Sequence, residues 1–194
     1  DAAMLYYSPQ IWCSDNTDAV NRLNIQYGTS FFYPVSTMGA HVSAVPNHQT
    51  GRVTPFKTRG HVALSGSFGY ELDLGKMSGE EKELVKEQIA EFHKYYSLTH
   101  EGTYYRLTGT EERFCAWEFV DGEQNHALQT LVMTSAQGNP LPVHTKVKGL
   151  APDKNYRCLL NGHVHSGRTW MNGGLTLSRV PGEYESVLIE WEAI

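Results

Sequence analysis

Cysteine is scarce in this chain of 194 residues, which contains three, Cys13, Cys115 and Cys158. Their number is odd, their spacings are unrelated and none belongs to a C-x-x-C pair, so the sequence predicts neither a disulfide framework nor a zinc ribbon. A reducing compartment is the simpler interpretation. We therefore expect a cytoplasmic protein.

Positive charge and long apolar runs are also lacking. Lys and Arg number 16 against 21 Asp and Glu, which gives a formal net charge of -5 at pH 7. Nucleic acids and anionic membranes attract clustered cations, so we expect neither as a partner. No stretch is long and apolar enough to span a bilayer, and no signal peptide is visible.

An initiator methionine is missing as well. The chain begins "DAAMLYY" and runs directly into the strand-like residues Leu5 to Tyr7, with no capping element before them. We therefore expect a piece of a longer polypeptide, with essential residues upstream.

Up to about residue 100 the sequence alternates strand-like, loop and helix-like segments, a pattern typical of parallel βα units. Asp18 suits the N-cap of a helix in which Val20, Leu23 and Tyr27 recur at helical spacing, with Gly28 past its end.

The rest of this half continues the alternation. Residues 31–45 are strand-like, and residues 56–74 predict a helix followed by a strand. The clearest helix covers residues 79–97, because Ser78 and Glu81 form an S-x-x-E capping box. Its predicted apolar face consists of Leu84, Val85, Ile89, Phe92 and Tyr96.

From about Thr103 the pattern changes to short β-rich runs separated by turn signals such as "DGEQN" and "QGNP". Such runs predict an antiparallel sandwich or open barrel, so we divide the chain into domains 1–102 and 103–194. The first domain is too small for a closed (β/α)8 barrel, which needs about 250 residues. If it belongs to a barrel, it supplies only the last part.

The stretch "SPQIWCSDNTDAV", residues 8–20, is the strongest site candidate, because polar groups crowd the end of a predicted strand. In a βα barrel, chemistry occurs where strands end. Asp15 and Asp18 are the candidate acids, with Trp12 beside them. Retaining glycoside hydrolysis needs two carboxylates about 5–5.5 Å apart. Asp18 is explained by capping alone and Asp15 is not, although an acid at a helix start is more often a cap than a catalyst.

Histidines occur in two further segments. His41 and His48 lie in the segment "MGAHVSAVPNHQTGR", where a ligand-facing role competes with the commoner one of hydrogen-bonded loop residues. His163 and His165 would share one face of a strand, but zinc normally takes three or four protein ligands. A solvated turn is the preferred interpretation, and no metal site is predicted.

Two groups of residues in the second half receive structural interpretations. The acids are expected to be exposed loop charges without chemistry; they are Glu111, Glu112, Glu118 and Asp121. The tryptophans could stack on sugars but are more often core or rim residues in a sandwich; they are Trp117, Trp170 and Trp191.

Specific motifs then identify a family. "PQIWCSDNTDA", "YGTS", "GAHVSAVPNHQTGR" and "GYELDL" resemble the C-terminal part of the catalytic barrel of bacterial α-galactosidases of glycoside hydrolase family thirty-six. The resemblance is dense over residues 1–100 and looser to the end, where "KGLAPDKNYRC" is similar to that family's C-terminal β-sandwich. It implies an α/β plus all-β chain: the C-terminal portion of a (β/α)8 TIM barrel followed by an antiparallel β-sandwich.

The resemblance also implies a function. It is the retaining, cofactor-free hydrolysis of terminal α-linked galactose, as in melibiose and raffinose. The general acid/base would be Asp15, with Asp18 as the helix cap or a supporting neighbour and Trp12 and Asn16 shaping its surroundings. The nucleophile would lie upstream in a K-W-D-like motif that this sequence lacks, so the chain alone should be inactive.

The expected partners are therefore an α-galactoside oligosaccharide and the remainder of the catalytic barrel, and we expect the complete enzyme to be a homo-oligomer. Two other functions stay open. One is a non-catalytic carbohydrate-binding or structural fragment. The other is a transglycosylase related to raffinose-synthesising enzymes, in which a sugar acceptor replaces water.

Overall fold

The computed structural model describes residues 2–109 and 112–194, so the predicted loop acid Glu111 lies outside the described residues. The chain divides into two compact units, Asp1–His100 and Glu101–Ile194. Among the described residues, no helix combines the length and apolar character needed to cross a membrane.

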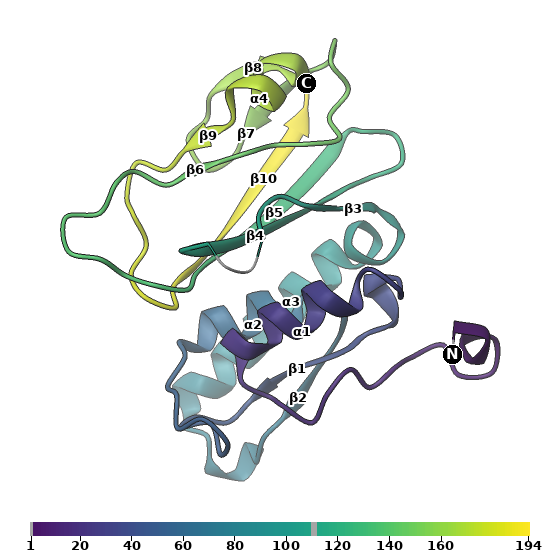
Figure 1. The fold of residues 1–194 in the computed structure, drawn as a ribbon, viewed down its shortest axis with the longest axis vertical. Helices are drawn as coiled ribbons and strands as arrows, with labels where there is room; N and C mark the ends of the chain where they lie inside the picture. Colours follow the sequence, from purple (N-terminus) through teal and green to yellow (C-terminus); the bar gives the residue numbers. More distant parts are fainter. Residues whose placement is uncertain (1, 110–111) are drawn as a thin grey trace. The chain divides into compact units, whose positions relative to one another are not determined.

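The first unit is built on two parallel strands, β1 (Gly39–Ser43) and β2 (Ser67–Glu71), in the register Gly39 opposite Ser67. Helix α2 (Phe56–Ala63) connects them, and α1 (Ala19–Thr29) and α3 (Gly79–Glu101) precede and follow (Figure 1). A parallel bridge between Ile11 and Met38 extends the pairing to the segment before α1. The predicted parallel βα pattern is therefore present.

The two faces of this small sheet differ in character. Ala40 and Val42 pack with Phe68 and Tyr70 into an apolar cluster that includes Ala63 of α2. Because side chains alternate along a strand, the opposite face of β1 carries Gly39, His41 and Ser43. The helices thus cover the apolar face, and the small and polar residues lie on the other.

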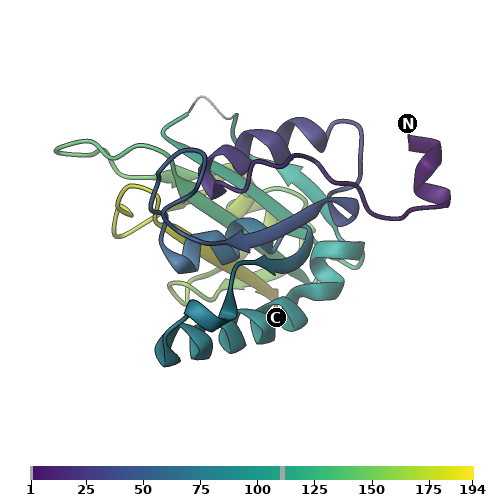
Figure 2. The same ribbon diagram turned by 90° about the horizontal axis from the view of Figure 1, so that it is seen from below.

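The predicted strand at Leu5–Tyr7 is wrong. Residues Ala2–Tyr6 form a 3-10 helix, η1, which contains no buried residue and stands away from the sheet (Figures 1 and 2). Tyr6 and Tyr7 are 87% and 79% exposed. A segment of high strand propensity forms a strand only where it can pair with another strand. Here the parallel bridge forms later in the chain, at Ile11.

Short 3-10 helices complete the first unit: η2 (Val35–Thr37) before β1 and η3 (Leu74–Lys76) after β2. Of the strand-like residues 31–45, only β1 is a strand. Helix α1 includes Gly28 and ends at Thr29, with Ser30 as its C-cap, so the prediction that Gly28 lies past the end of the helix is wrong.

Helix α3 starts as predicted but buries a different face. Ser78 and Glu81 make both hydrogen bonds of the capping box, at 3.1 and 2.8 Å. The apolar residues Leu84, Ile89 and Tyr96 are nevertheless exposed, and the buried residues are Gln88, Tyr95, Leu98 and Thr99. Gln88 is drawn inward because its amide donates to the Phe56 carbonyl and accepts from the Tyr70 hydroxyl.

The second unit is a six-stranded antiparallel sheet in the order β3-β4-β5-β10-β7-β8, with a separate β6–β9 pair (Figure 1). The strands are β3 (Thr103–Arg106), β4 (Phe114–Val120), β5 (His126–Met133), β6 (His144–Thr145), β7 (Asn155–Cys158), β8 (Val164–Ser166), β9 (Leu175–Thr176) and β10 (Ser186–Ala193). Helix α4 (Gly167–Gly173) lies between β8 and β9.

The main core of this unit joins the large sheet to the segments that carry β6, α4 and β9. Trp170 and Trp191 belong to it, and the Trp170 indole donates to the Tyr156 carbonyl. Trp117 is buried as well. The prediction that the three tryptophans are core residues is therefore confirmed.

The prediction for Glu118 is wrong. Its side chain is fully buried on β4, opposite Gln129 of β5, and its Oε2 accepts from the Lys148 amide at 3.0 Å. Gln129 donates to Thr145 Oγ1 and to the Lys146 carbonyl at 2.7 and 3.0 Å. The two residues fasten the covering segment to the sheet, while the Oε1 atom of each has no hydrogen-bond partner.

Burial raises the pKa of Glu118 to about 8, although the Lys148 amide and the Lys148 charge act in the opposite direction. The carboxyl is therefore protonated at neutral pH. A protonated carboxyl has a hydrogen to donate, and the unpartnered Oε1 of Gln129 is an acceptor. The charge state thus suits the site.

This pKa predicts that stability falls as the pH rises between about 4.5 and 8, because the unfolded chain releases the proton there and the folded chain keeps it. The slope should reach about 1.4 kcal/mol per pH unit. Glu118→Gln should remove it, since the amide keeps a donor without titrating. Urea unfolding at pH 5 and pH 8 measures the difference, and exposed Glu183→Gln is the control. An unchanged slope in Glu118→Gln contradicts the assignment.

Candidate functional site

The segment before α1 is fixed against the edge of β1. The Ile11 amide donates to the Thr37 carbonyl at 2.7 Å, and the Gly39 amide donates to the Ile11 carbonyl at 2.8 Å. Trp12 to Asp18 therefore follow directly after a parallel pairing. In open and closed parallel sheets, ligands bind at the ends of strands, so this segment occupies the expected place for a site.

Asp15 is exposed, and its carboxylate is held by one neighbour. The Trp12 indole Nε1 donates to Asp15 Oδ1 at 2.8 Å. The same indole stacks on the His41 imidazole, with ring centroids 4.4 Å apart and planes 21° from parallel. The structure therefore brings together two predicted site residues, Trp12 and Asp15, and adds His41 from β1.

Asp18 is buried and caps α1. Its Oδ1 accepts from the amides of Val20 and Asn21 at 2.8 and 3.1 Å, as the sequence predicted. Arg52 Nη1 lies 2.5 Å from the same oxygen, and the Thr50 hydroxyl donates to Oδ2. Burial alone would raise the pKa of Asp18, but the bonds from Thr50, Asn21 and Arg52 outweigh it and lower the pKa.

Asn16 has a structural task in this conformation. Its side-chain oxygen accepts from the Asp18 amide at 3.0 Å, and its own amide donates to Ser14 Oγ at 3.1 Å. These are local turns of the type that Asn and Ser favour before helices. The turns set the direction in which Asp15 leaves the backbone.

The loop after β1 is bonded to the same segment. Ser43 Oγ donates to the Thr17 carbonyl at 2.8 Å, and Asn47 Nδ2 donates to Thr17 Oγ1 at 3.0 Å. His48 is exposed on this loop. The two loops, which follow the Ile11 pairing and β1, therefore form one polar surface that carries Asp15.

Arg22 of α1 is a supporting residue that the sequence did not reveal. Its buried guanidinium donates to the carbonyls of Ser14 and Gly39 and to Gln26. Burial lowers its pKa, and the thiol of Cys13 is a neighbour that acts in the opposite direction. A charged residue on a helix is ordinarily expected to face solvent. The role of Arg22 is therefore identified only by its bonds to the Ser14 and Gly39 carbonyls.

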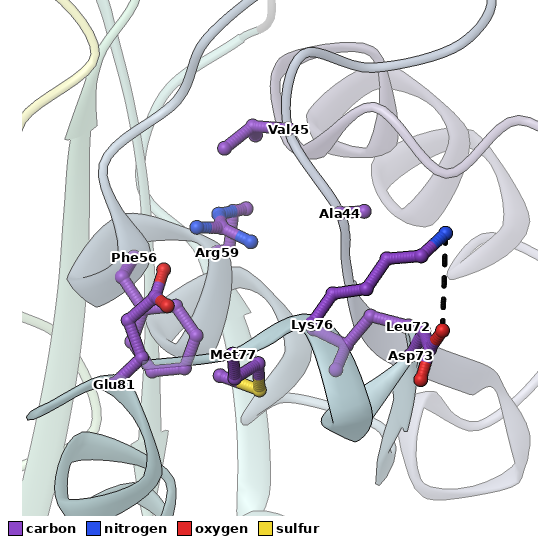
Figure 3. A pocket seen from close by; sticks show the side chains of 9 residues that line it. All are labelled: Ala44, Val45, Phe56, Arg59, Leu72, Asp73, Lys76, Met77 and Glu81. Atoms are coloured by element: carbon purple, nitrogen blue, oxygen red, sulfur yellow. Dashed lines mark ion pairs between the residues drawn. The ribbon is translucent and has the colours of Figure 1, made fainter. Parts of the chain in front are cut away.

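A cavity of about 350 Å³ lies beyond the ends of β1 and β2, between Ala44, Val45, Leu72 and the start of α2 (Figure 3). Buried Arg59 lines it and donates to the Thr54 carbonyl at 3.1 Å. The Lys76–Asp73 ion pair, 3.8 Å long, stands at the opposite wall. None of the four predicted site residues, Trp12, Asp15, Asn16 and Asp18, is among the lining residues.

Potential metal ligands gather elsewhere. Within residues 2–109 and 112–194, the one group of three comprises His126, Glu190 and Glu192, with His126 Nε2 2.7 Å from Glu190 Oε1. His163 and His165 are both exposed and do not belong to such a group. Of the three, Glu190 is buried, His126 is half-buried and Glu192 is exposed, and the group carries no argument for a metal site.

Comparison with known families matches both units. Residues 1–102 match the model of the Melibiase family, and residues 114–190 match the glycosyl hydrolase family 36 C-terminal domain. Two curated relatives carry the name α-galactosidase. The chain is 54% identical over 187 residues to the bifunctional alpha-galactosidase/sucrose kinase AgaSK of Mediterraneibacter gnavus, and 46% identical over 194 residues to alpha-galactosidase Mel36A of Lactobacillus acidophilus.

Solved structures agree. The family 36 α-galactosidase AgaA of Geobacillus stearothermophilus, in a variant complexed with raffinose, superimposes with a TM-score of 0.95 at 45% identity over 100% of this chain. The match covers 27% of that structure. The match to AgaSK covers 96% of this chain and 20% of AgaSK, and the match to Mel36A covers 100% of this chain and 26% of Mel36A. It therefore corresponds to about a quarter of these relatives.

The Asp18 network predicts a strong local effect of substitution. Asp18→Ala removes both the cap and the ion pair with Arg52, so the first unit should lose about 2–4 kcal/mol. Asp18→Asn keeps the cap and should lose less. The lowered pKa means that this stability is complete above the ordinary value of 3.8 and is lost as the pH falls through the lowered one.

Amide hydrogen exchange of Val20 and Asn21 measures the loss where it arises. Asp153→Ala, which removes an exposed partner of Arg168, is the control and should leave these amides unchanged. Equal protection in wild type and Asp18→Ala would contradict the role of the cap.

Proposed function

Because this chain belongs to the Melibiase family of glycoside hydrolases, family 36, we propose that it is the C-terminal part of a retaining α-galactosidase. It supplies the general acid/base, and the nucleophile comes from residues outside the printed sequence. The observation that carries the proposal is Asp15: an exposed carboxylate at the end of a parallel pairing, with one oxygen held by an indole N–H.

The arrangement of the first unit supports the last part of a (β/α)8 barrel. The order Ile11 segment, β1, β2 is parallel throughout, with helices on the apolar face. Both outer edges of this arrangement would pair with strands of the remaining barrel. Large apolar side chains such as Met4, Tyr6 and Phe32 are exposed in this chain and would be covered by the rest of the protein.

For the second unit we propose an antiparallel β-sandwich. The six-stranded sheet forms one layer, and the β6–β9 pair with its flanking segments forms the other. The shared apolar core between them, which includes Val143, Leu175 and Ile189, supports this arrangement.

The two carboxylates of the segment would divide the chemistry and the scaffolding. Asp15 gives its proton to the glycosidic oxygen as the bond to galactose breaks, and then takes a proton from the water that releases galactose from the nucleophile. Both oxygens of Asp18 accept hydrogen bonds and its pKa is lowered, so it stays ionised and caps the start of α1. Asn16 contributes the turn between them.

The ligands of related structures support a substrate class. Structures of Geobacillus stearothermophilus AgaA variants hold raffinose and stachyose. When the bond to the terminal galactose of either sugar breaks, the glycosidic oxygen stays with the remaining sugar, which departs poorly without a proton, so an acid such as Asp15 is needed. We therefore propose α-galactoside oligosaccharides of this kind as substrates of the complete protein.

Asp15→Ala in the complete enzyme should lower activity far more for substrates with poor leaving groups than for those with good ones. With raffinose, kcat/KM should fall by about 10²–10⁴-fold, the share that general acid–base catalysis supplies. With an activated aryl α-galactoside, which needs little protonation, it should fall by less than about tenfold. Azide should restore turnover and give α-galactosyl azide, because it replaces the water that no longer has a base.

Equal loss on both substrates without azide rescue would contradict the assignment, and β-galactosyl azide would indicate that Asp15 is the nucleophile. Asp153→Ala, an exposed substitution in the second unit, serves as the control.

Residues 1–194 should have no galactosidase turnover when they are expressed alone, because covalent catalysis requires the nucleophile that we place outside them. Release of nitrophenol from an aryl α-galactoside is the measurement. Turnover by the purified segment, in the absence of any other chain, would show that the nucleophile lies within it.

A further inference from the structure

We propose that His41 is a positioning residue for Asp15 and acts through Trp12. The inference rests on the function proposed above and extends it to a residue of β1. In this arrangement the imidazole supports the indole, and the indole holds one oxygen of the acid/base.

The first step is that Asp15 depends on Trp12. The Asp15 side chain is exposed, and its Oδ1 accepts from the indole N–H at 2.8 Å. With Oδ1 occupied, Oδ2 is the oxygen that remains to carry the proton between substrate and water. The direction of the carboxyl group is therefore set by the place of the indole.

The second step is that Trp12 needs a support. Within this chain Trp12 is 56% exposed, so the neighbours that it has here cover less than half of its surface. The indole lies across the polar face of β1, where an added Cβ on Gly39 would come within 3.1 Å of Trp12 Cε3. The His41 ring, two residues further along the same face, stacks on the indole at 4.4 Å.

The third step is that His41 is itself held in place. Its side chain is 10% exposed on a strand whose register with β2 is set by five residue pairs. Nε2 lies 3.2 Å from Glu71 Oε2, without the alignment of a hydrogen bond. The backbone of β1 therefore decides where the ring lies.

The charge of the imidazole suits a stacking role. Burial lowers the pKa of His41, the Arg22 charge lowers it further, and Glu71 opposes them. The ring is therefore neutral at neutral pH, and the contact is an aromatic stack between two neutral rings. Such pairs contribute about 0.5–1.5 kcal/mol beyond their buried area.

The test uses the complete enzyme and three substitutions. His41→Ala removes the stacking ring, His41→Phe keeps an aromatic ring without the imidazole nitrogens, and Trp12→Phe keeps a stacking ring but lacks the N–H. The readout is kcat/KM for raffinose and for an activated aryl α-galactoside, because kcat/KM reports the step in which the glycosidic bond breaks. His163→Ala, an exposed histidine of the second unit, is the matched control.

His41→Ala should lower kcat/KM for raffinose by about tenfold or more, a part of the roughly 10²–10⁴-fold that acid catalysis supplies. With the aryl substrate the loss should stay below about threefold, since little protonation is needed. His41→Phe should recover most of the raffinose activity. Trp12→Phe should show the same split between substrates as His41→Ala.

The double variant His41→Ala/Trp12→Phe isolates the route. If His41 acts through Trp12, kcat/KM for raffinose should be little lower in the double variant than in Trp12→Phe alone. The reason is that Trp12→Phe already removes the N–H through which the His41 ring influences Asp15. Fully additive losses would overturn the route through Trp12. A uniform loss on both substrates, or a failure of His41→Phe to recover activity, would overturn the positioning role itself.

The outcome for Asp15→Ala separates this inference from the proposed function. If Asp15→Ala lacks the split between leaving groups, the function proposed for Asp15 fails. If Asp15→Ala shows the split and His41→Ala matches wild type, only the role of His41 fails. Thermal unfolding of each variant identifies loss of folding, and the conservative His41→Phe then carries the test.

Discussion

The carboxylate of Asp18 is the contact on which the candidate site depends. It ends the irregular segment by capping α1, and it accepts from Thr50 and Arg52 of the loop after β1. Two loops that are more than 30 residues apart in the sequence are thereby fixed to one helix start. Because Asp18 is saturated with donors, its neighbour Asp15 is the acid left to face solvent. The geometry separates a structural carboxylate from an available one within four residues.

Each of the two units contains a buried carboxyl group. The carboxyl of the first unit is ionised, and that of the second is protonated. Asp18 stays ionised because hydrogen bonds and an arginine compensate for its burial. Glu118 accepts from the Lys148 backbone amide, and this bond together with the Lys148 charge does not outweigh burial, so the pKa is raised and the proton stays on. Arg22 follows the first rule with backbone carbonyls as its acceptors. In each case the partner groups, rather than the residue type, decide the protonation that the fold tolerates.

Chain-local features were predictable because their physical cause lies within a few residues. The Ser78–Glu81 capping box and the Asp18 cap are local hydrogen bonds, and the structure contains both. The β-rich runs "FCAWEFV" and "SVLIEWEAI" became strands of the large sheet; β4 is buried along its whole length and β10 over part of it. The strand predicted at Leu5–Tyr7 failed for the complementary reason: a strand needs a partner, and propensity does not supply one.

By itself the sequence determined the starts of α1 and α3, the parallel character of the first half, the antiparallel character of the second and the candidacy of Asp15, because these follow from spacing, turn chemistry and family motifs. Only the tertiary structure decided which residues meet. It placed His41 against Trp12, brought the Ser14 and Gly39 carbonyls to Arg22, and buried Glu118, which the sequence alone suggested was an exposed loop charge. The physical reason is that such contacts join residues distant in sequence, so their energy depends on strand register and helix packing that no local pattern encodes.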